Sequence, residues 1–475
     1  MHDLSLASRR GGATRVEGTR LEAFRTAMRG ETLLPGEPGY DQARAVWNAM
    51  IDRRPALVAR CSGVADVLRC VELAREHELL VSVRGAGHNI AGKAVCDDGL
   101  VIDLSRMRHV RVDPDGRRAR VAPGATLADL DHETQAFGLA TPLGINSTTG
   151  VAGLTLGGGF GWLTRRFGLA ADNLMAADVV TADGRLLHTS ERHEPDLLWG
   201  LRGGGGNLGI VTSFEFRLHP VGPEVLAGLV VHPFSAARDV MRHWRDFMAQ
   251  APEDLTCWVV ARKAPPLPFL PEAWHGREVL ILAMVYAGDM EGGTAAARPL
   301  REHGKPIADV VGPHPYVAFQ QALDPLLQPG SRNYWKSHNF ASLPDAAIDT
   351  FLGHVERLPS PQCELFMGNL GGAAGRVGVS ATAYPHRDAN FVLNVHARWE
   401  ARQDDAACTA WARGVFDTMA PYATGGVYVN FMSADEDRVR AAYGPNYERL
   451  ARLKKRYDPT NLFRVNQNVA PAGRG

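Results

Sequence analysis

Three glycine-dense stretches in the first half of the chain limit the folds that it can adopt. They are residues 84–89 (RGAGHN), 150–161 (GVAGLTLGGGFG) and 203–209 (GGGGNLG). Glycine lacks a Cβ atom, so it allows turns that other residues resist and lets a ligand approach the backbone closely. The first two stretches therefore predict loops whose backbone N–H groups surround a large ligand.

Strands and helices alternate around these stretches. Residues 56–84 predict a strand, an amphipathic helix and a second strand, which together form a βαβ unit. Residues 175–190 predict a hairpin that turns at Asp183 and Gly184, and residues 210–220 predict a strand. The third glycine stretch has the spacing GxGxxG, but it leads into that strand and not into a helix. This context argues against a Rossmann dinucleotide site.

A change in composition and in the length of the predicted elements after Pro220 and Pro223 predicts a second domain. Beyond these prolines, glycine clusters become fewer and the strands become longer. Helices such as residues 236–250 are expected to pack on a mainly antiparallel sheet. The predicted strands of this sheet are residues 224–234, 277–288, 363–372, 390–399 and 425–431. The chain is therefore expected to be an α+β protein.

The charge and cysteine content excludes several classes of function. Lysine and arginine number 52, and aspartate and glutamate also number 52. The chain therefore has no overall field to attract nucleic acid or an anionic membrane, and a small-molecule substrate is expected. The six cysteines form no CxxC pair, which argues against a zinc site and a disulfide framework. No apolar run approaches the roughly 20 residues that span a bilayer, so the expected location is the cytoplasm.

The order of four motifs changes the interpretation of His88, which alone would be expected to be a structural residue in a glycine loop. The motifs are RGAGHNIAG (84–92), LGGGFGWLTRRFGLAADN (156–173), DLLWGLRGGGGNLGIVTSFEFRLHP (196–220) and YDPTNLFRVNQNV (457–469). Together they resemble the berberine-bridge-enzyme-like family of FAD-linked oxidoreductases, within the vanillyl-alcohol-oxidase type of flavoproteins. The resemblance covers nearly the whole chain.

This resemblance implies a two-subdomain FAD-binding domain of the p-cresol-methylhydroxylase (PCMH) type over residues 40–220. It also implies a substrate domain over residues 221–435 and a C-terminal segment, residues 436–475, that returns to the first domain. The cofactor would be FAD, bonded through its 8α-methyl group to His88. The other residues that the resemblance places at the cofactor are Arg84, Gly85, Gly87, Asn89, Thr149, Gly150, Gly153, Gly157, Gly159, Asp172, Asn173, Gly209, Val211, Asn466 and Asn468.

The second glycine turn departs from one form of the family. Members with two covalent links carry a cysteine just before this turn, whereas this chain has Asn146 or its neighbour at that place. Cys96 lies in a different loop and is expected to be a small buried apolar residue. No second, cysteinyl link is therefore expected. Thr149 falls near the family position whose bulk gates oxygen, and it resembles the permissive form, although ordinary turn packing explains it equally well.

The resemblance also places a proton acceptor over the flavin, on strands of the second domain. Tyr428, in the predicted strand 425–431, is the first candidate. Its phenol would need positive charge from Arg398 or Lys336 to lower its pKa. A strand tyrosine is equally compatible with ordinary core packing.

The strand predicted over residues 390–399 supplies the other candidates. It would place Asn394, His396 and Arg398 on one face, which suits a binding site, although a solvated edge strand would look the same. His396 is the alternative proton acceptor. The predicted catalytic set is therefore Tyr428, His396 and Asn394.

Two classes of activity fit these features. The first is an oxidase that takes a hydride from a C–H bond beside an alcohol or amine of a sugar or secondary metabolite and passes electrons to O2. The second uses the same fold for a redox-neutral cyclisation, or as a dehydrogenase with another acceptor. Fold alone does not decide between them.

Overall fold

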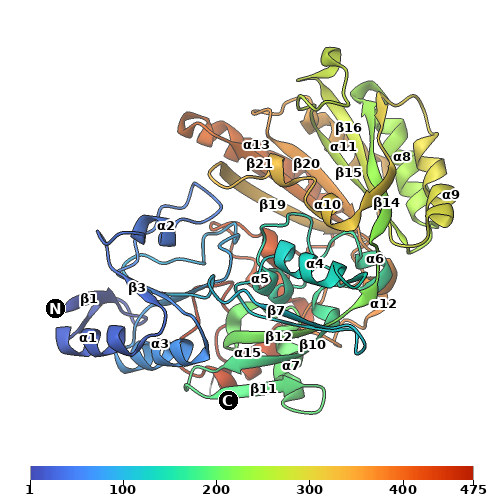
Figure 1. The fold of residues 1–475 in the computed structure, drawn as a ribbon. Coiled ribbons are helices and arrows are strands. Elements are labelled where there is room, and N and C mark those ends of the chain that lie inside the picture. The colour runs from blue at the N-terminus through green and yellow to red at the C-terminus, as the bar shows by residue number, and fades with distance from the viewer. Residues whose placement is uncertain (1, 474–475) are drawn as a thin grey trace.

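The computed structural model describes residues 2–473, whose helices and strands form two lobes (Figure 1). A four-stranded sheet in the order β3-β4-β6-β5 opens the first lobe, and β4, β5 and β6 in it are parallel. Helix α3 crosses between β4 and β5, which confirms the predicted βαβ unit. The elements of residues 2–103 are β1 (Leu4–Ala7), β2 (Ala13–Val16), α1 (Gly18–Ala27), β3 (Glu31–Leu33), α2 (Tyr40–Arg44), β4 (Leu57–Arg60), α3 (Val64–Glu76), β5 (Val81–Arg84) and β6 (Leu100–Asp103).

A five-stranded antiparallel sheet completes the first lobe, in the order β11-β10-β12-β8-β7. The predicted hairpin is confirmed as β10 and β11, with Gly184 in the left-handed region at φ +82°. The third glycine stretch leads into β12, as predicted. The elements here are β7 (Val110–Asp113), β8 (Arg118–Val121), α4 (Leu127–Gln135), β9 (Leu139–Ala140), α5 (Val151–Leu156), α6 (Thr164–Phe167), β10 (Leu174–Val180), β11 (Leu186–Ser190), α7 (Pro195–Leu201), β12 (Ile210–Arg217) and β13 (His219–Pro220).

The second lobe is built on one large sheet, whose strand pairs are all antiparallel. Its order is β17-β14-β16-β15-β20-β21-β19, and β18 pairs with β14. The strands are β14 (Glu224–Pro233), β15 (Leu255–Lys263), β16 (Glu278–Tyr286), β17 (Ala308–Asp309), β18 (Gly312–Pro315), β19 (Arg332–Phe340), β20 (Glu364–Asn369) and β21 (Phe391–Trp399). Four of the five predicted strands of this lobe are confirmed.

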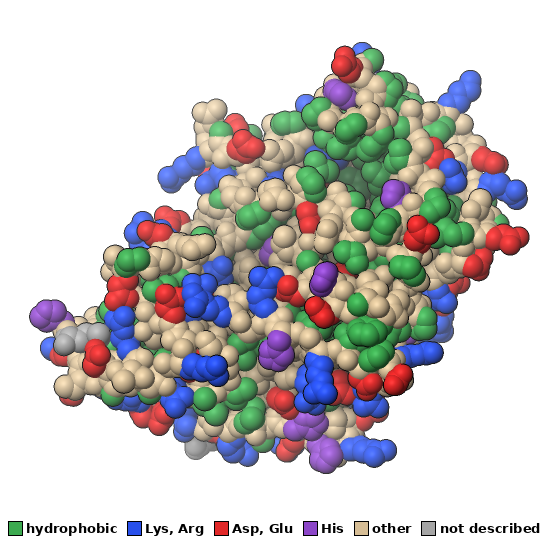
Figure 2. Space-filling model, viewed as in Figure 1, with side chains coloured by type: hydrophobic (Ala, Val, Ile, Leu, Met, Phe, Trp, Pro, Cys, Tyr) green, Lys and Arg blue, Asp and Glu red, His purple; other side chains and the backbone are tan. Residues whose placement is uncertain are grey.

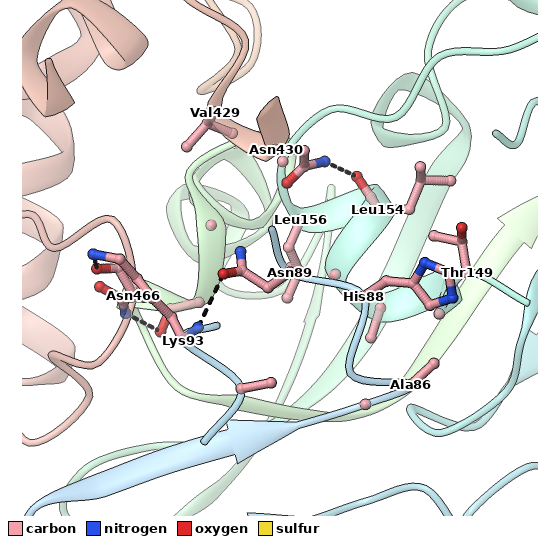
Figure 3. Close-up of a pocket in the computed structure, with 18 of the residues that line it drawn as sticks. Ala86, His88, Asn89, Lys93, Thr149, Leu154, Leu156, Val429, Asn430 and Asn466 are labelled. Carbon is pink, nitrogen blue, oxygen red and sulfur yellow. Dashed lines mark hydrogen bonds between the residues drawn. The ribbon is translucent and has the colours of Figure 1, made fainter. Parts of the chain in front are cut away.

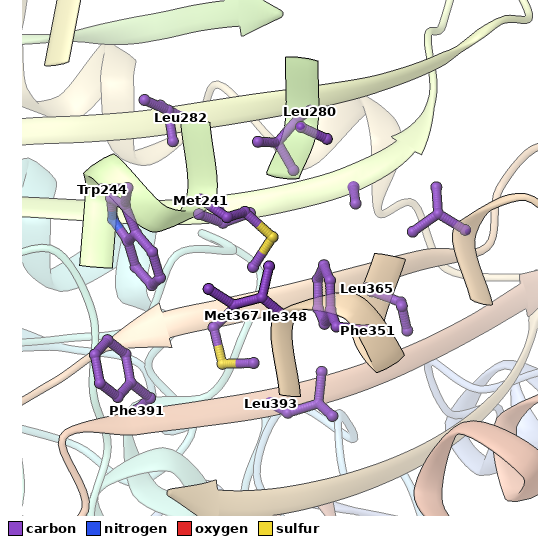
Figure 4. Close-up of a cluster of buried hydrophobic side chains, with 14 of the residues drawn as sticks. Met241, Trp244, Leu280, Leu282, Ile348, Phe351, Leu365, Met367, Phe391 and Leu393 are labelled. Atoms are coloured by element: carbon purple, nitrogen blue, oxygen red, sulfur yellow. The ribbon is translucent and has the colours of Figure 1, made fainter. Parts of the chain in front are cut away.

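Helices cover one face of this sheet and close its core. Trp244 and Met241 of α8 and Phe351 of α11 pack on Leu365 and Leu393 of the strands (Figure 4). Burying a side chain of this size stabilises the fold by roughly 1.5–3 kcal/mol. The helices of this part of the chain are α8 (Ala237–Met248), α9 (Met290–Arg301), α10 (Tyr316–Gln320), α11 (Asp345–Val355), α12 (Gly372–Arg376), α13 (Asp405–Met419), α14 (Val439–Tyr443) and α15 (Tyr447–Tyr457).

The other face of the sheet meets the first lobe through aromatic side chains. Trp162, which follows the second glycine stretch, stacks on Trp258 of β15 with the ring centroids 4.3 Å apart. Trp258 in turn contacts the ring edge of Phe366 on β20. These aromatic contacts place the polar residues of β20 and β21 opposite the glycine stretches.

Residues 425–431 do not form the predicted strand. Tyr428 has an extended backbone, but Val429–Phe431 form a single 3₁₀ turn. The side chains of this segment bind the second glycine turn, because Gly159 donates its N–H to the Tyr428 hydroxyl and Asn430 donates to the Leu154 carbonyl. Tyr428 and Asn430 therefore bind the glycine turn, and no sheet strand is formed over residues 425–431.

The C-terminal segment runs back along the first lobe after α15. Leu462 and Phe463 enter the core beneath the four-stranded sheet, and Lys454 pairs with Asp458 at 2.6 Å with both side chains buried. Residues 474 and 475 of the predicted segment lie outside the described residues. Within residues 2–473, no helix combines the length and apolar content needed to cross a bilayer. On the face shown in Figure 2, acidic and basic side chains are interspersed.

Candidate active site

A cavity of about 360 Å³ lies between the two lobes and is lined by all three glycine stretches, the C-terminal segment and the large sheet. Figure 3 shows part of its wall, with His88, Thr149 and Asn466 among the labelled side chains. Fourteen predicted site residues line it: Gly85, Gly87, His88, Asn89, Thr149, Gly150, Gly153, Gly157, Gly209, Val211, Asn394, His396, Tyr428 and Asn466. Tertiary structure thus gathers these residues from both lobes around one space.

His88 stands in the loop that begins where β5 ends. Gly87 before it is left-handed at φ +78°, a conformation that favours glycine. The imidazole Nε2 lies 2.9 Å from the Thr148 hydroxyl, and the ring of Trp47 stacks on it at 5.3 Å. Burial lowers the pKa of His88 to about 4, so its imidazole is neutral at physiological pH.

The second glycine stretch presents bare backbone to the cavity. No atom lies within 4 Å of the position that a Cβ on Gly153 would take. A Cβ on Gly157 would instead meet the Asn430 carboxamide at 2.2 Å. Gly157 therefore needs to be glycine for the packing of residues 425–431, whereas Gly153 leaves open space that a ligand can fill.

The third stretch and the C-terminal segment form the opposite end of the cavity. Lys93 donates to the Asn466 carbonyl at 2.7 Å there. The Asn466 Oδ1 atom and both polar side-chain atoms of Gln467 are buried without a partner among the described residues. Buried polar groups are normally hydrogen-bonded, so these atoms indicate a missing polar ligand.

Five predicted cofactor residues do not line the cavity, and four of them have structural partners. Arg84 lies behind the loop, where its guanidinium donates to the Ala43 carbonyl. Gly159 donates its N–H to Tyr428 at 3.1 Å, and Asp172 forms a buried ion pair with Arg387 at 2.6 Å.

The remaining two are Asn173 and Asn468. Asn173 donates to the Phe167 and Leu169 carbonyls, and its Oδ1 lies 2.7 Å from the ring of His219. Asn468 does not line the cavity, and its buried Oδ1 has no hydrogen-bond partner among residues 2–473. The first four residues therefore support the wall from behind, and the cofactor contacts predicted for all five stay predictions.

The substrate half of the cavity centres on a row of side chains across three neighbouring strands. Trp335 of β19, His396 of β21 and Glu364 of β20 lie in register on one face. The Nδ1 of His396 donates to Glu364 at 3.0 Å, and the Nε2 faces the Asn333 Oδ1 at 3.2 Å. Arg262 donates to the second Glu364 oxygen at 2.6 Å.

The charge of this pair follows from its neighbours. Burial alone would raise the pKa of Glu364, but Arg262 and His396 outweigh it and hold that pKa at about 2. Burial lowers the pKa of His396 below its usual value, while the hydrogen bond to Glu364 opposes that change. The pair therefore combines a carboxylate with an imidazole that can take up a proton.

Tyr428 lacks the positive charge that the sequence predicted for it. Arg398 donates to the Gln328 carbonyl, and Lys336 pairs with Asp435 and Glu436. The Tyr428 hydroxyl accepts hydrogen bonds from Gly159 and from Asn430, yet burial raises the pKa of its phenol to about 12. The predicted lowering of its pKa is wrong.

Several wall residues were not predicted from the sequence, namely Trp47, Lys93, Glu364, Phe366, Asn430 and Gln467. Two of them carried a usable signal. Glu364 and Phe366 alternate with apolar residues in CELFMGN, which places them on the same face of a strand. Trp47 lies in a segment without regular structure and carried no such signal.

Taken together, the half of the cavity that is lined by the glycine stretches and the C-terminal segment fits FAD. Exposed glycine backbone beside Gly153 and Gly206 suits a phosphate-bearing ligand. The unpartnered amides of residues 466 and 467 suit a polar ligand, and neutral His88 faces the same space. These residues would hold the cofactor with the substrate half of the cavity beside it.

Comparisons with known proteins agree with this geometry. An FAD binding domain model matches residues 55–190, and a berberine and berberine-like model matches residues 427–470. The chain is 30% identical to the (R)-6-hydroxynicotine oxidase of Paenarthrobacter nicotinovorans over 94% of this chain and 98% of that protein.

Two solved structures share the fold. The 6-hydroxy-D-nicotine oxidase of Arthrobacter nicotinovorans superposes with a TM-score of 0.84 at 28% identity, covering 94% of this chain and 98% of that one. A xylooligosaccharide oxidase of Myceliophthora thermophila has a TM-score of 0.82 at 25% identity, covering 95% and 99%. This chain belongs to the berberine-bridge-enzyme-like family and is an FAD-dependent oxidoreductase.

Proposed function

We propose that this protein is an oxidase that takes a hydride from a C–H bond beside an alcohol or amine of a small, largely apolar organic substrate and passes electrons to O2. The observation that carries the proposal is one cavity that joins the flavin-binding loops to the buried pair Glu364 and His396. Bound FAD supplies the hydride and electron chemistry, and the chain supplies binding, orientation and proton transfer.

A single covalent bond from His88 to the flavin is part of this proposal. A neutral imidazole keeps a lone pair for bond formation, and burial holds His88 in that form. All six cysteines are free and buried, and none lines the cavity among residues 2–473. No thiol is therefore placed to form a second bond.

The wall of the substrate half favours an apolar substrate. Phe160 and Phe431 lie 4.9 and 4.8 Å from the ring of Tyr428, and Trp335 and Phe366 complete an aromatic enclosure. A sugar would need a partner for each of its hydroxyls, and this wall offers few. Within the described residues, Lys93 is the one Lys or Arg in the cavity wall, so an anionic substrate also lacks a partner.

Proton transfer falls to His396 with Glu364 beside it. An alcohol must lose its O–H proton as its carbon loses hydride, and a buried imidazole backed by a carboxylate can accept that proton. When His396 is neutral, its Nε2 lone pair faces the oxygen of Asn333, and protonation turns this contact into a hydrogen bond. Glu364 and Asn333 thus favour the protonated imidazole, while burial opposes it and leaves the pKa of His396 below its usual value.

The choice of O2 as acceptor is supported by Thr149, which lines the flavin half of the cavity. Its small side chain resembles the oxygen-permissive form of the family. Under this proposal, enlarging Thr149 would slow reoxidation of the reduced flavin more than its reduction.

The test is a screen of apolar cyclic alcohols and amines, with sugars as the comparison set, under anaerobic conditions. A substrate should bleach the yellow flavin absorbance, and air should restore it with one peroxide released for each turnover. Product formation without bleaching would favour a redox-neutral cyclase. Bleaching that air fails to reverse would favour a dehydrogenase with another acceptor.

A further inference from the structure

The hydrogen bonds around His88 determine which of its ring nitrogens is free. The Nε2 lies 2.9 Å from Thr148 Oγ1, and that hydroxyl lies 2.7 Å from Asn146 Oδ1. The Thr148 backbone N–H also donates to Asn146 Oδ1, at 3.1 Å. Because a backbone N–H can only donate, the Asn146 atom that it meets is the carbonyl oxygen, and this amide cannot be reversed.

This fixed amide sets the direction of the remaining bonds. Asn146 Oδ1 can only accept, so the single hydroxyl proton of Thr148 is donated to it. The Thr148 oxygen must then accept from His88, which places the imidazole proton on Nε2. The Nδ1 of His88 keeps its lone pair and has no hydrogen-bond partner within residues 2–473.

Trp47 holds the ring in this orientation. Its indole stacks on the imidazole with the planes 22° apart, and its Nε1 donates to the Leu327 carbonyl at 2.8 Å. The guanidinium of Arg398 lies 5.3 Å from the indole ring. A rotation of His88 that exchanged its two nitrogens would have to break the Thr148 hydrogen bond against this packing.

We propose that Asn146 and Thr148 are positioning residues for cofactor attachment, because they hold the His88 proton on Nε2 and leave the Nδ1 lone pair free. This inference rests on the histidyl bond of the proposed function and names the two residues that prepare the imidazole for it. Asn146 would hold Thr148 in place, whereas the cysteine that doubly linked relatives carry at or beside this position bonds to the flavin.

The attachment balances with dioxygen as the oxidant. A bond forms between Nδ1 and the 8α carbon, that carbon loses one C–H proton, and the imidazole gives up its Nε2 proton to solvent beside the exposed Thr148. Two electrons and two protons pass to O2, so that FAD, imidazole and O2 yield the linked flavin and hydrogen peroxide.

The experiment compares wild type with Thr148→Val, which keeps the shape of the side chain but loses the hydroxyl, and with Thr148→Ser, which restores it. Each protein is incubated with added FAD in air, precipitated in acid, and assayed for flavin in the pellet over time. The Val variant should link its flavin at least tenfold more slowly than wild type, and the Ser variant should recover most of the rate. The flavin-bearing peptide of wild type, examined by NMR, should carry the bond on Nδ1.

The outcomes separate this inference from the proposed function. If wild type links its flavin and Thr148→Val does so at the same rate, the positioning role is overturned and the histidyl bond stands. A peptide linked through Nε2 also overturns it. If wild-type protein releases all its flavin into acid, the covalent bond and this inference both fail.

Discussion

At the scale of single residues, two histidines of the cavity wall have different neighbours and therefore different chemistry. His88 and His396 are both shielded from bulk water, but only His396 has a carboxylate beside it. His88 is suited to bond formation and His396 to proton uptake. Each assignment leads to a separate prediction.

His88→Ala should release the flavin into the supernatant after acid precipitation, because no cysteine lines the wall among residues 2–473 and the Lys93 amine is bound to the Asn466 carbonyl. Cys96→Ser should keep the flavin in the pellet. The Cys96 thiol is buried, it contacts the Ser82 hydroxyl at 3.4 Å, and burial raises its pKa to about 11. Flavin absorbance of pellet and supernatant measures both results, and flavin lost from the Cys96 variant would contradict the single bond.

His396→Gln and Glu364→Gln should each slow flavin reduction by an alcohol by roughly 10²-fold, the usual size for a lost general base. Tyr428→Phe is the matched control from the same cavity. With its pKa raised to about 12, Tyr428 stays protonated, and its loss should change the reduction rate by no more than about threefold. Anaerobic stopped-flow measures all three, and a large loss in the Tyr428 variant alone would restore the tyrosine as base.

The pH profile of reduction should follow the same assignment. A base works while it is unprotonated, so the rate should be constant at high pH and fall as pH drops through the pKa of His396. Burial lowers that pKa, so the fall should lie below pH 6.5. In Glu364→Gln the carboxylate that raises this pKa is gone, so the fall should move to lower pH. A rate that rises with acidity would contradict an imidazole base.

At the scale of elements, the segment after the second glycine turn is held by the ion pair of Asp172 and Arg387, whose side chains are 10% and 2% exposed. Asp172→Asn should leave a buried charge unpaired and cost about 3–5 kcal/mol of unfolding free energy. The exposed pair of Arg376 and Glu253 is the control, and Arg376→Gln should cost at most about 1 kcal/mol. Urea denaturation followed by circular dichroism compares them, and equal losses would contradict a structural role for Asp172.

Residues 425–431 show at the same scale how a local pattern can fail. Their alternation of apolar and polar residues is typical of a strand, but the strand needs a partner edge along its length. Two hydrogen bonds with the glycine turn replace that partner. Gly159 donates its N–H to the Tyr428 hydroxyl, and Asn430 donates to the Leu154 carbonyl. They connect positions far apart in the chain, which a window of seven residues does not contain.

At the scale of the whole molecule, FAD should stabilise the fold, because the cavity wall draws on both lobes and the C-terminal segment. In His88→Ala protein freed of flavin, added FAD at a hundredfold excess over its Kd should raise the unfolding free energy by about 2.7 kcal/mol. Adding Gln467→Leu to this protein should weaken the gain at the same FAD concentration, since both polar side-chain atoms of Gln467 lack a partner among residues 2–473. Gln250→Leu, at an exposed position beyond α8, is the control. A gain unchanged by the Gln467 variant would place that side chain away from the cofactor.

The sequence by itself determined what depends on neighbours along the chain. The βαβ unit, the hairpin at Gly184, four strands of the large sheet and the order of glycine motifs all follow from periodicity or from the backbone freedom of glycine. Four ordered motifs also identified the family, because each one is local.

Only the tertiary structure decided which side chains share the cavity. It turned Asp172 and Asn173 to structural partners, brought Glu364 beside His396, and stacked Trp47 on His88. It also buried Tyr428 away from the cations predicted to activate it. These outcomes depend on contacts between distant segments and on burial, which sets the pKa of each group, and neither is encoded in local spacing.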